Sequence, residues 1–203
     1  MISTIAIIDY GMGNIHSVNK ALEVCGARTL VTNKPEDIRS CDMAVLPGVG
    51  AFDDAMQELE KLGLVPVIME HVLARKPFLG ICLGMQLLFE TSEEGKLAKG
   101  LGILKGKVRR FEARKDLKVP HMGWNSIKVT SPFFKDIADG SFVYFCHSYY
   151  PDPIEKSVIA STCNYGIDFA CAVAQDNVFG MQFHPEKSQK VGLKMLESFI
   201  KLC

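Results

Sequence analysis

In the first half of the chain, hydrophobic residues follow two different spacings. Residues 5–8 form an unbroken apolar run that ends at Asp9, which is typical of a strand covered on both faces of a sheet. The runs at 29–32, 43–46 and 78–81 are also predicted to be strands. Such fully buried strands are most common in parallel sheets, where each strand needs a crossover connection to the next.

The segments between these runs have the spacing of amphipathic helices, because apolar side chains recur every three or four residues. This alternation predicts an α/β fold in which a mostly parallel central sheet is flanked by helices. The predicted helix faces consist of Val18, Ala21, Leu22 and Cys25, then Phe52, Ala55, Met56 and Leu59, and then Val65, Ile68, Met69 and Val72.

The pattern changes after about residue 103, where strand-like runs follow one another without helical spacing. The runs at 169–174 and 178–183 are joined by polar residues, which is typical of an antiparallel hairpin. The C-terminal half should therefore add an antiparallel portion, closed by an apolar helix face at 193–200. No repeat or linker separates the halves, so we expect a single domain over 1–203. The other strands expected here lie at 127–130, 142–147 and 158–162.

Composition narrows the possible functions. The chain has 203 residues, of which 48% are hydrophobic, and this is enough to fill a core and to exclude a disordered protein. Its 23 Lys and Arg balance 23 Asp and Glu, so no overall basic field attracts nucleic acid or an anionic membrane. The longest apolar stretch, 77–89, is shorter than the about 20 residues that span a bilayer.

The cysteines and the N-terminal segment point to a reducing compartment. Seven cysteines occur without a CxxC pair or regular spacing, so we expect neither a disulfide framework nor a metal site. The N-terminal segment lacks the basic region of a signal peptide, and we expect a cytoplasmic protein. No cofactor is expected either, because His16 stands where a dinucleotide fingerprint that begins at Gly11 needs its third glycine.

A candidate nucleophile stands at Cys82, where a predicted strand meets a helix that begins near Met85. Gly80 and Gly84 flank it in a GxCxG pattern, which is the nucleophile elbow with sulfur in place of the serine hydroxyl. Small neighbours allow the tight turn and the approach of a substrate carbonyl. The start of the helix favours a thiolate and offers N–H groups to an oxyanion. The alternative is a buried structural cysteine beside packing glycines.

A candidate base and its partner follow the last predicted strand, in the sequence His184, Pro185, Glu186. His184 and Glu186 are two residues apart, so both side chains can lie on one side of a segment that Pro185 stiffens. A cysteine nucleophile needs a base, and an imidazole base needs an acceptor that fixes its tautomer. Taken alone, the pair could be a surface histidine beside a carboxylate. Taken with Cys82, it predicts a catalytic triad.

A glycine-rich turn at Gly48, Val49 and Gly50 ends another predicted strand. Adjacent glycines let backbone N–H groups be exposed and reoriented, which suits an oxyanion hole. By itself, the turn is explained more simply as a plain left-handed turn.

Together and in this order, these elements resemble the class I, or triad, glutamine amidotransferases, which have a flavodoxin-like α/β fold. The resemblance covers essentially the whole chain. Five stretches are more specific and are similar to the glutaminase subunits of imidazole glycerol phosphate synthases in histidine biosynthesis: 9–14 (DYGMGN), 46–52 (LPGVGAF), 80–86 (GICLGMQ), 120–125 (PHMGWN) and 147–149 (HSY).

The resemblance implies a role for each matching residue. Glutamine would be hydrolysed through a thioester, and the ammonia would pass to a (βα)8 cyclase subunit in a heterodimer. That subunit forms imidazole glycerol phosphate and aminoimidazole carboxamide ribotide. In this scheme Cys82 is the nucleophile, His184 the base and Glu186 its orienting acid. The oxyanion hole is supplied by Leu83 and by the segment Gly48, Val49 and Gly50. The ends of glutamine are held by Gln86, Ser148 and Tyr149.

A docking surface for this partner is expected at Tyr10, Asn14, Met122 and Trp124, since aromatic anchors are enriched at interfaces. Trp124 could equally belong to the core. Rotation of a peptide in the glycine-rich turn at 48–50 is expected to switch the enzyme on when the partner docks.

Three other interpretations stay open. A cysteine-elbow protease or chaperone usually has a histidine directly after the cysteine, where this chain has Leu83. A non-catalytic binding subunit would not need Cys82, His184 and Glu186 together. A paralogous amidotransferase subunit could supply ammonia to a different synthase, for example in sugar amination.

Overall fold

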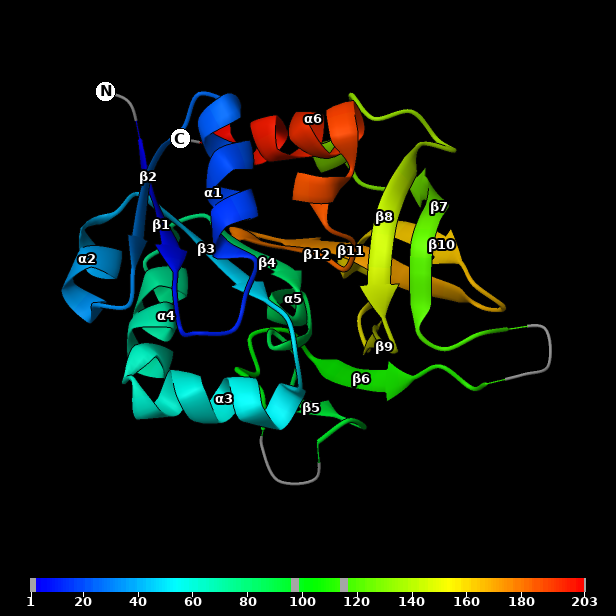
Figure 1. Cartoon of the computed structure of the whole chain (residues 1–203), viewed down its shortest axis with the longest axis horizontal. Helices are drawn as coiled ribbons and strands as arrows, with labels where there is room; N and C mark the ends of the chain where they lie inside the picture. Colours follow the sequence, from blue (N-terminus) through cyan, green and yellow to red (C-terminus); the bar gives the residue numbers. More distant parts are fainter. Residues whose placement is uncertain (1–2, 96–98, 114–116, 203) are drawn as a thin grey trace.

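The computed structural model describes residues 3–95, 99–113 and 117–202 of the chain (Figure 1). One large mixed sheet contains β1 (Thr4–Ile8), β2 (Arg28–Thr32), β3 (Met43–Gly48), β4 (Phe78–Cys82), β7 (His121–Val129), β8 (Phe142–His147), β10 (Ile159–Asn164), β11 (Asp168–Gln175) and β12 (Val178–Met181). Its strand order is β2-β1-β3-β4-β12-β11-β10-β7-β8. A smaller sheet consists of β5 (Thr91–Ser92), β6 (Gly106–Arg110) and β9 (Tyr149–Pro153), in the order β5-β6-β9.

Helices cover both faces of the large sheet (Figure 1). On one face α1 (Ile15–Val24) packs beside α6 (Gln189–Ile200), and on the other α3 (Phe52–Lys61) packs beside α4 (Leu64–Leu73). The short helix α2 (Pro35–Ser40) packs on α4, and α5 (Leu83–Gln86) follows β4 directly. Within the described ranges, none of the helices has the length and apolar character needed to cross a bilayer. Three 3-10 turns lie at Pro132–Phe134, Lys156–Val158 and Pro185–Lys187.

Strand β12 joins the parallel and antiparallel parts of the large sheet. It runs parallel to β4, with Met181 opposite Ile81, and antiparallel to β11. The strands β1 to β4 pair in parallel, whereas β7, β8, β10 and β11 pair antiparallel. The predicted α/β fold, with parallel strands flanked by helices and an added antiparallel portion, is confirmed. Because β3, β4 and β12 are parallel neighbours, the segments that follow them begin at the same edge of the sheet.

Alternate side chains of the central strands fill two cores, one on each face of the sheet. From β1, Ile5 and Ile7 pack in the core below α1 and α6, whereas Ala6 and Ile8 pack in the core below α3 and α4. This explains the unbroken apolar run at 5–8, since both faces of the strand are covered.

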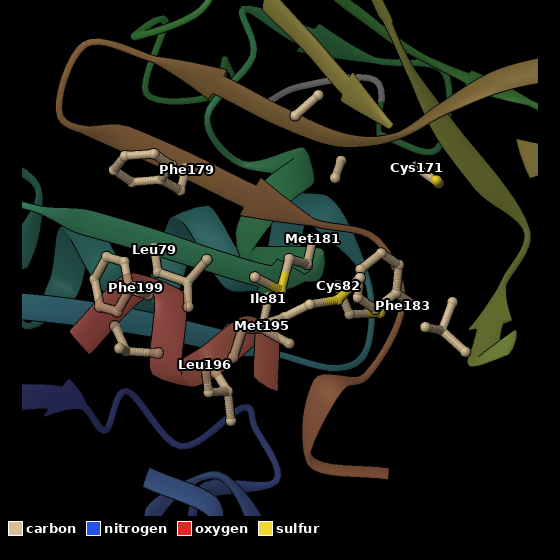
Figure 2. Close-up of a cluster of buried hydrophobic side chains, with 14 of the residues drawn as sticks. Leu79, Ile81, Cys82, Cys171, Phe179, Met181, Phe183, Met195, Leu196 and Phe199 are labelled. Carbon is tan, nitrogen blue, oxygen red and sulfur yellow. The ribbon is translucent and has the colours of Figure 1, made fainter. Parts of the chain in front are cut away.

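The core below α6 extends to Cys82. Figure 2 shows β4 and β12 side by side, with α6 packed against them and Cys82 at the end of the apolar cluster beside Phe183. The strand that carries the candidate nucleophile is therefore held by burial along its whole length. Besides Cys82 and Phe183, the labelled residues of this cluster are Leu79, Ile81, Cys171, Phe179, Met181, Met195, Leu196 and Phe199.

Several elements have no counterpart in the apolar pattern. Helix α2 and strand β5 are short; in β6 only Gly106 and Val108 are buried, and β9 contains two prolines. Strand β7 begins at His121, six residues before the predicted start at 127, because its first half pairs with β8 through the backbone. Strand β12 ends at Met181, two residues before the predicted 183. The Gln182 N–H still bonds to Cys171 O in β11, and the chain then turns so that the His184 N–H bonds to Tyr144 O in β8.

Candidate active site

Cys82 stands at the junction of β4 and α5 in a strained backbone conformation. Its φ of 55° and ψ of −111° lie in a region that residues other than glycine rarely adopt. The residue is only 6% exposed. Strain of this kind persists where the surrounding fold imposes it, and it is expected at the nucleophile of an elbow.

The flanking glycines are required because no side chain fits at either position. A Cβ on Gly84 would collide with the backbone oxygen of Leu46 in β3, and a Cβ on Gly80 would meet the backbone of Gly84. The backbones of β3, β4 and α5 are therefore in direct contact. The GxCxG spacing is a packing requirement of this elbow as well as a way of leaving the sulfur accessible.

His184 and Glu186 follow β12 and reach the same edge as Cys82, because β12 is the neighbour of β4. His184 Nδ1 lies 2.9 Å from Glu186 Oε1, and the two side chains are 4% and 1% exposed. The His184 backbone is fixed on both sides, since its N–H donates to Tyr144 O and its carbonyl accepts from Ser188 Oγ. The structure thus brings together the three residues of the predicted triad.

Cys82 and Glu186 together favour the charged form of His184. Burial lowers the pKa of this imidazole, but hydrogen bonds with the Cys82 sulfur and with Glu186, and the negative charges of both, outweigh burial and raise the pKa of His184 to about 10. Because Nδ1 faces Glu186, Nε2 is the nitrogen left to face the sulfur. An imidazolium in this position stabilises a thiolate, which is the nucleophilic form of cysteine.

Two buried glutamines connect Cys82 to strand β9. Gln182 Nε2 lies 3.8 Å from Cys82 Sγ. Gln86 Nε2 donates to Gln182 Oε1 and to Tyr149 O, at 3.0 Å each. Sequence reasoning singles out Gln86 but not Gln182. The place of Gln182 beside Cys82 is set by strand register, which the sequence does not reveal: Met181 lies opposite Ile81, and the next residue comes level with Cys82.

A cavity of about 340 Å³ opens over the sulfur. Gly48, which is also predicted for the oxyanion hole, is not among the lining residues, and a Cβ there would come within 2.6 Å of the Tyr10 hydroxyl oxygen. Gly50 has a φ of 107°, which favours glycine. A larger hollow of about 800 Å³ surrounds Phe111 and Tyr150, but none of its lining residues is a cysteine. The predicted glutamine and oxyanion residues that line the cavity over Cys82 are Val49, Gly50, Leu83, Gln86, Ser148 and Tyr149.

Glu94 anchors the turn that borders this cavity. Its Oε2 accepts a hydrogen bond of 2.9 Å from the Phe52 N–H, at the start of α3 and two residues after Gly50. Burial raises the pKa of the Glu94 carboxyl. Ala51 gives α3 no side-chain cap, so Glu94 takes that role. Sequence reasoning misses it because the two residues are 42 positions apart.

The predicted docking residues do not all reach the surface. Met122 and Trp124 are 61% and 46% exposed, and Asn14 is half-buried. Tyr10 is only 2% exposed, so the prediction that it offers an aromatic anchor at the surface is wrong. Its ring packs in the core below α3 and α4, because the apolar strand β1 carries it inward next to Gly48.

Met122 and Trp124 belong to an exposed apolar face on the β7–β8 edge of the large sheet. Met122 lies opposite Cys146 and Trp124 opposite Tyr144, so these four side chains share one face, together with Phe142. Phe142 is 57% exposed. Cys146 also lines the cavity over Cys82. This edge face, defined by Met122, Trp124, Phe142, Tyr144 and Cys146, therefore reaches the mouth of the candidate active site.

The chain is similar to known proteins over nearly its whole length. The model of the family "Glutamine amidotransferase class-I" matches residues 6–202. The chain is 52% identical over 203 residues to the imidazole glycerol phosphate synthase subunit HisH of Methanosarcina acetivorans, covering 98% of each chain. It is 51% identical over 202 residues to the subunit of the same name from Thermosynechococcus vestitus, covering 98% of this chain and 96% of that one.

The fold has a solved counterpart in PurLQS from Thermotoga maritima. One of its chains superposes with a TM-score of 0.72 at 19% identity, covering 100% of this chain and 99% of that one. At this identity the likeness concerns the fold alone. The match of the family model over nearly the whole length, together with relatives above 50% identity, shows that this chain belongs to the class I glutamine amidotransferase family.

Proposed function

We propose that this chain is the glutaminase subunit of an imidazole glycerol phosphate synthase, in which Cys82, His184 and Glu186 hydrolyse glutamine to glutamate and ammonia. The observation that carries the proposal is the buried arrangement of these three side chains, in which His184 contacts Glu186 and the raised pKa of His184 favours an imidazolium beside the sulfur. Relatives that are about 50% identical over nearly their full length are named as subunits of this synthase, which supports the assignment.

The first half of the reaction forms a thioester. The proton of the Cys82 thiol rests on His184 Nε2 while the sulfur attacks the γ-amide carbon of glutamine. The C–N bond then breaks, and His184 gives the proton to the leaving nitrogen. Ammonia departs, and the γ-glutamyl group remains on the sulfur.

The second half releases glutamate. His184, now neutral, takes a proton from a water molecule that attacks the thioester carbon. The carbon–sulfur bond breaks, and the thiolate is again beside the imidazolium. Glu186 stabilises the positive charge in both halves through its bond to Nδ1.

Backbone groups at the cavity complete this site. The oxyanion that forms in each attack is bound by the amides of Leu83 and of the segment Val49 to Gly50. The α-amino and carboxylate groups of glutamine are held by Gln86 and by the backbone around Ser148 and Tyr149. Their common place in the lining of one cavity supports these roles.

The ammonia passes to a (βα)8 cyclase subunit, which forms imidazole glycerol phosphate and aminoimidazole carboxamide ribotide in histidine biosynthesis. The two subunits form a heterodimer, and the edge face of this chain is the docking surface. Its exposed Met122 and Trp124 beside the cavity support this choice. We place the reaction in the cytoplasm, which is consistent with the free thiols of the six described cysteines.

Replacement of the nucleophile tests the proposal. We expect Cys82→Ala to abolish glutamine-dependent synthesis by the complex and to leave synthesis from added ammonia largely intact, because the thiol acts only in liberating ammonia. Both rates are measured on the purified heterodimer. Cys25→Ala is the matched control, since this half-buried cysteine lies outside the cavity and should keep both activities. Loss of both activities in an assembled Cys82→Ala complex would contradict the proposal.

The same assay separates the paralogue alternative. A chain that hydrolyses glutamine through Cys82 but gives no imidazole glycerol phosphate with the cyclase subunit would be an amidotransferase subunit of a different synthase.

A further inference from the structure

We propose that His147 is a positioning residue for glutamine, which fixes the Tyr149 carbonyl and with it the Ser148–Tyr149 backbone beside Cys82, and that His121 holds its imidazole in the required tautomer. The inference rests on the proposed function, because it names residues that shape the glutamine site without touching the reacting atoms.

A chain of hydrogen bonds defines the relay. His147 Nδ1 lies 2.7 Å from Tyr149 O. His147 Nε2 lies 3.0 Å from His121 Nδ1, and His121 Nε2 lies 3.3 Å from Asn125 Nδ2. These residues belong to the paired strands β7 and β8 and to the start of β9, so the relay links the large sheet to the small one.

Only one arrangement of protons satisfies this chain with neutral rings. The amide of Asn125 is oriented by two other bonds, because its Oδ1 accepts from the Ser126 N–H and its Nδ2 donates to Asn164 O. Nδ2 can therefore only donate, and His121 Nε2 accepts. His121 must then carry its proton on Nδ1 and donate to His147 Nε2. His147 in turn carries its proton on Nδ1 and donates to the Tyr149 carbonyl.

The surroundings keep both rings neutral. His121 and His147 are 3% and 6% exposed, and His121 is stacked between the rings of Phe145 and Tyr165. Burial lowers the pKa of His121 to about 4 and that of His147 to about 3. A neutral His147 is needed because a protonated Nε2 could not accept from His121.

The relay acts on the glutamine site through one carbonyl. Tyr149 O accepts from His147 Nδ1 and also from Gln86 Nε2, so two donors from different elements fix this peptide. Ser148 and Tyr149 border the same cavity as Cys82. Without the His147 donor, Gln86 alone would hold the Tyr149 carbonyl, while the Phe111 N–H still binds Ser148 O. The peptide after Tyr149 would then be held less tightly, and the backbone beside the ends of glutamine would shift. The loss should therefore fall on substrate binding more than on the chemical step.

Kinetics of the heterodimer test this role. His147→Phe keeps a ring in the aromatic cluster but removes both nitrogens. We expect the KM for glutamine to rise about tenfold, with kcat changed less than about threefold, because the binding that is lost is the same in the ground state and the transition state. His147→Asn places an amide N–H near the position of Nδ1, and we expect it to restore KM to within about threefold of the wild-type value. An unchanged KM in His147→Phe, or a fall in kcat at constant KM, would overturn the proposal.

His71 offers a matched control. It is a buried histidine whose Nε2 contacts the backbone carbonyl of Pro77, but it lies on α4, outside the cavity. His71→Phe should lower the melting temperature without changing the KM for glutamine. A rise in KM as large as that of His147→Phe would mean that any loss of packing produces the effect, and would overturn the positioning role.

Nitrogen NMR of the wild-type heterodimer tests the relay independently of activity. We expect both rings to be protonated on Nδ1 between about pH 6 and 8, with a scalar coupling across the hydrogen bond from His121 Nδ1 to His147 Nε2. A proton on His147 Nε2 would refute the relay. Absence of glutamine hydrolysis by the wild-type heterodimer would instead overturn the proposed function, so the two failures are distinguishable.

Discussion

At the scale of single residues, the charge state of His184 depends on two neighbouring side chains that come from different parts of the sequence. Cys82 approaches from β4, and Glu186 follows His184 in the same turn. Both oppose the effect of burial, and the balance raises the pKa of His184 to about 10. The imidazole is therefore ready to donate a proton at neutral pH, and Glu186 should tune its strength as an acid without being required for the reaction.

Glu186→Gln tests this balance. The amide still accepts a hydrogen bond but carries no charge, so we expect glutaminase turnover to fall less than in His184→Ala, which should be almost as inactive as Cys82→Ala. We also expect the His184 titration, followed by NMR, to move to lower pH. Full wild-type turnover in Glu186→Gln, with an unchanged titration, would show that Glu186 has no such role.

The same shift has a consequence for stability. The folded pKa of His184 lies above its ordinary value of 6.5, so its contribution to the free energy of unfolding is complete below about pH 6.5 and is lost as pH rises through about 10. In Glu186→Gln the folded pKa is lower, so the loss should be smaller and should be complete at lower pH. Thermal unfolding between about pH 6 and 10, compared with wild type, measures this difference.

The Tyr10 hydroxyl is a second residue-scale feature, because it is buried and has no hydrogen-bond partner among the described residues. Burial and the nearby Cys82 raise its pKa, so it stays neutral. An unsatisfied buried hydroxyl costs about 1–3 kcal/mol, and we expect Tyr10→Phe to be as stable as wild type or more so in urea unfolding. Tyr165→Phe is the control, since its hydroxyl donates to Lys118 O at 2.7 Å and its loss should cost about 1 kcal/mol. A clear loss of stability in Tyr10→Phe would reveal a partner for this hydroxyl.

At the scale of elements, the elbow depends on backbone contact between β3, β4 and α5. Gly84→Ala would drive a methyl group into the Leu46 carbonyl, so we expect a loss of about 3 kcal/mol or more, or failure to fold. Gly140→Ala is the control. At its φ of 79° an alanine would be strained, but open space surrounds the position, so this substitution should lower the free energy of unfolding by only about 1 kcal/mol. Equal stability of the two variants in urea unfolding would contradict the packing account of the GxCxG motif.

Elements that bury apolar side chains could be predicted from the sequence, and those held by the backbone could not. The run at 78–81 identifies β4 because each of its residues is buried. The segment from His121 to Ser126 has no apolar alternation, and only its pairing with β8 makes it a strand. Cys82 and His184 could be paired from the sequence because each follows a buried strand and the two residue types match a nucleophile and its base. The structure alone shows that these strands are neighbours. Gln182 and Glu94 could not be assigned from the sequence, since their partners are set by strand register and by a distant helix start.

At the scale of the whole molecule, the candidate site and the edge face lie against each other. Cys146 belongs to both, because it lines the cavity and lies opposite Met122. Lys187 also lines the cavity and stands 5.8 Å from the centre of the Tyr144 ring. A protein that covers the edge face would therefore touch groups at the cavity mouth. Docking and glutamine hydrolysis can be coupled over this short distance.

This arrangement favours a switch that docking controls. Free hydrolysis would waste glutamine, so we expect the isolated chain to be a nearly idle glutaminase and the (βα)8 subunit with its nucleotide ligand to activate it. The turn at 48–50 can supply the change, because Val49 is 44% exposed at the cavity and Gly50 permits its peptide to rotate. An oxyanion N–H that is presented or withdrawn changes the rate by about 10²- to 10³-fold. Steady-state assays of the chain with and without its partner measure the gain, and full turnover by the chain alone would exclude the switch.

Trp124→Ala tests whether the edge face carries this activation. Trp124 is the largest aromatic residue of the face, and the centre of its ring lies 6.1 Å from that of Tyr144. It is therefore the natural anchor for a partner. A hot spot of this kind contributes about 2 kcal/mol, and we expect the Kd for the cyclase subunit to rise about thirtyfold while the low activity of the isolated chain is unchanged. Leu73→Ala, at a residue 77% exposed on α4, should leave the Kd unaltered. If Trp124→Ala binds and is activated as well as wild type, the partner docks elsewhere, and the coupling through Cys146 and Lys187 must be abandoned.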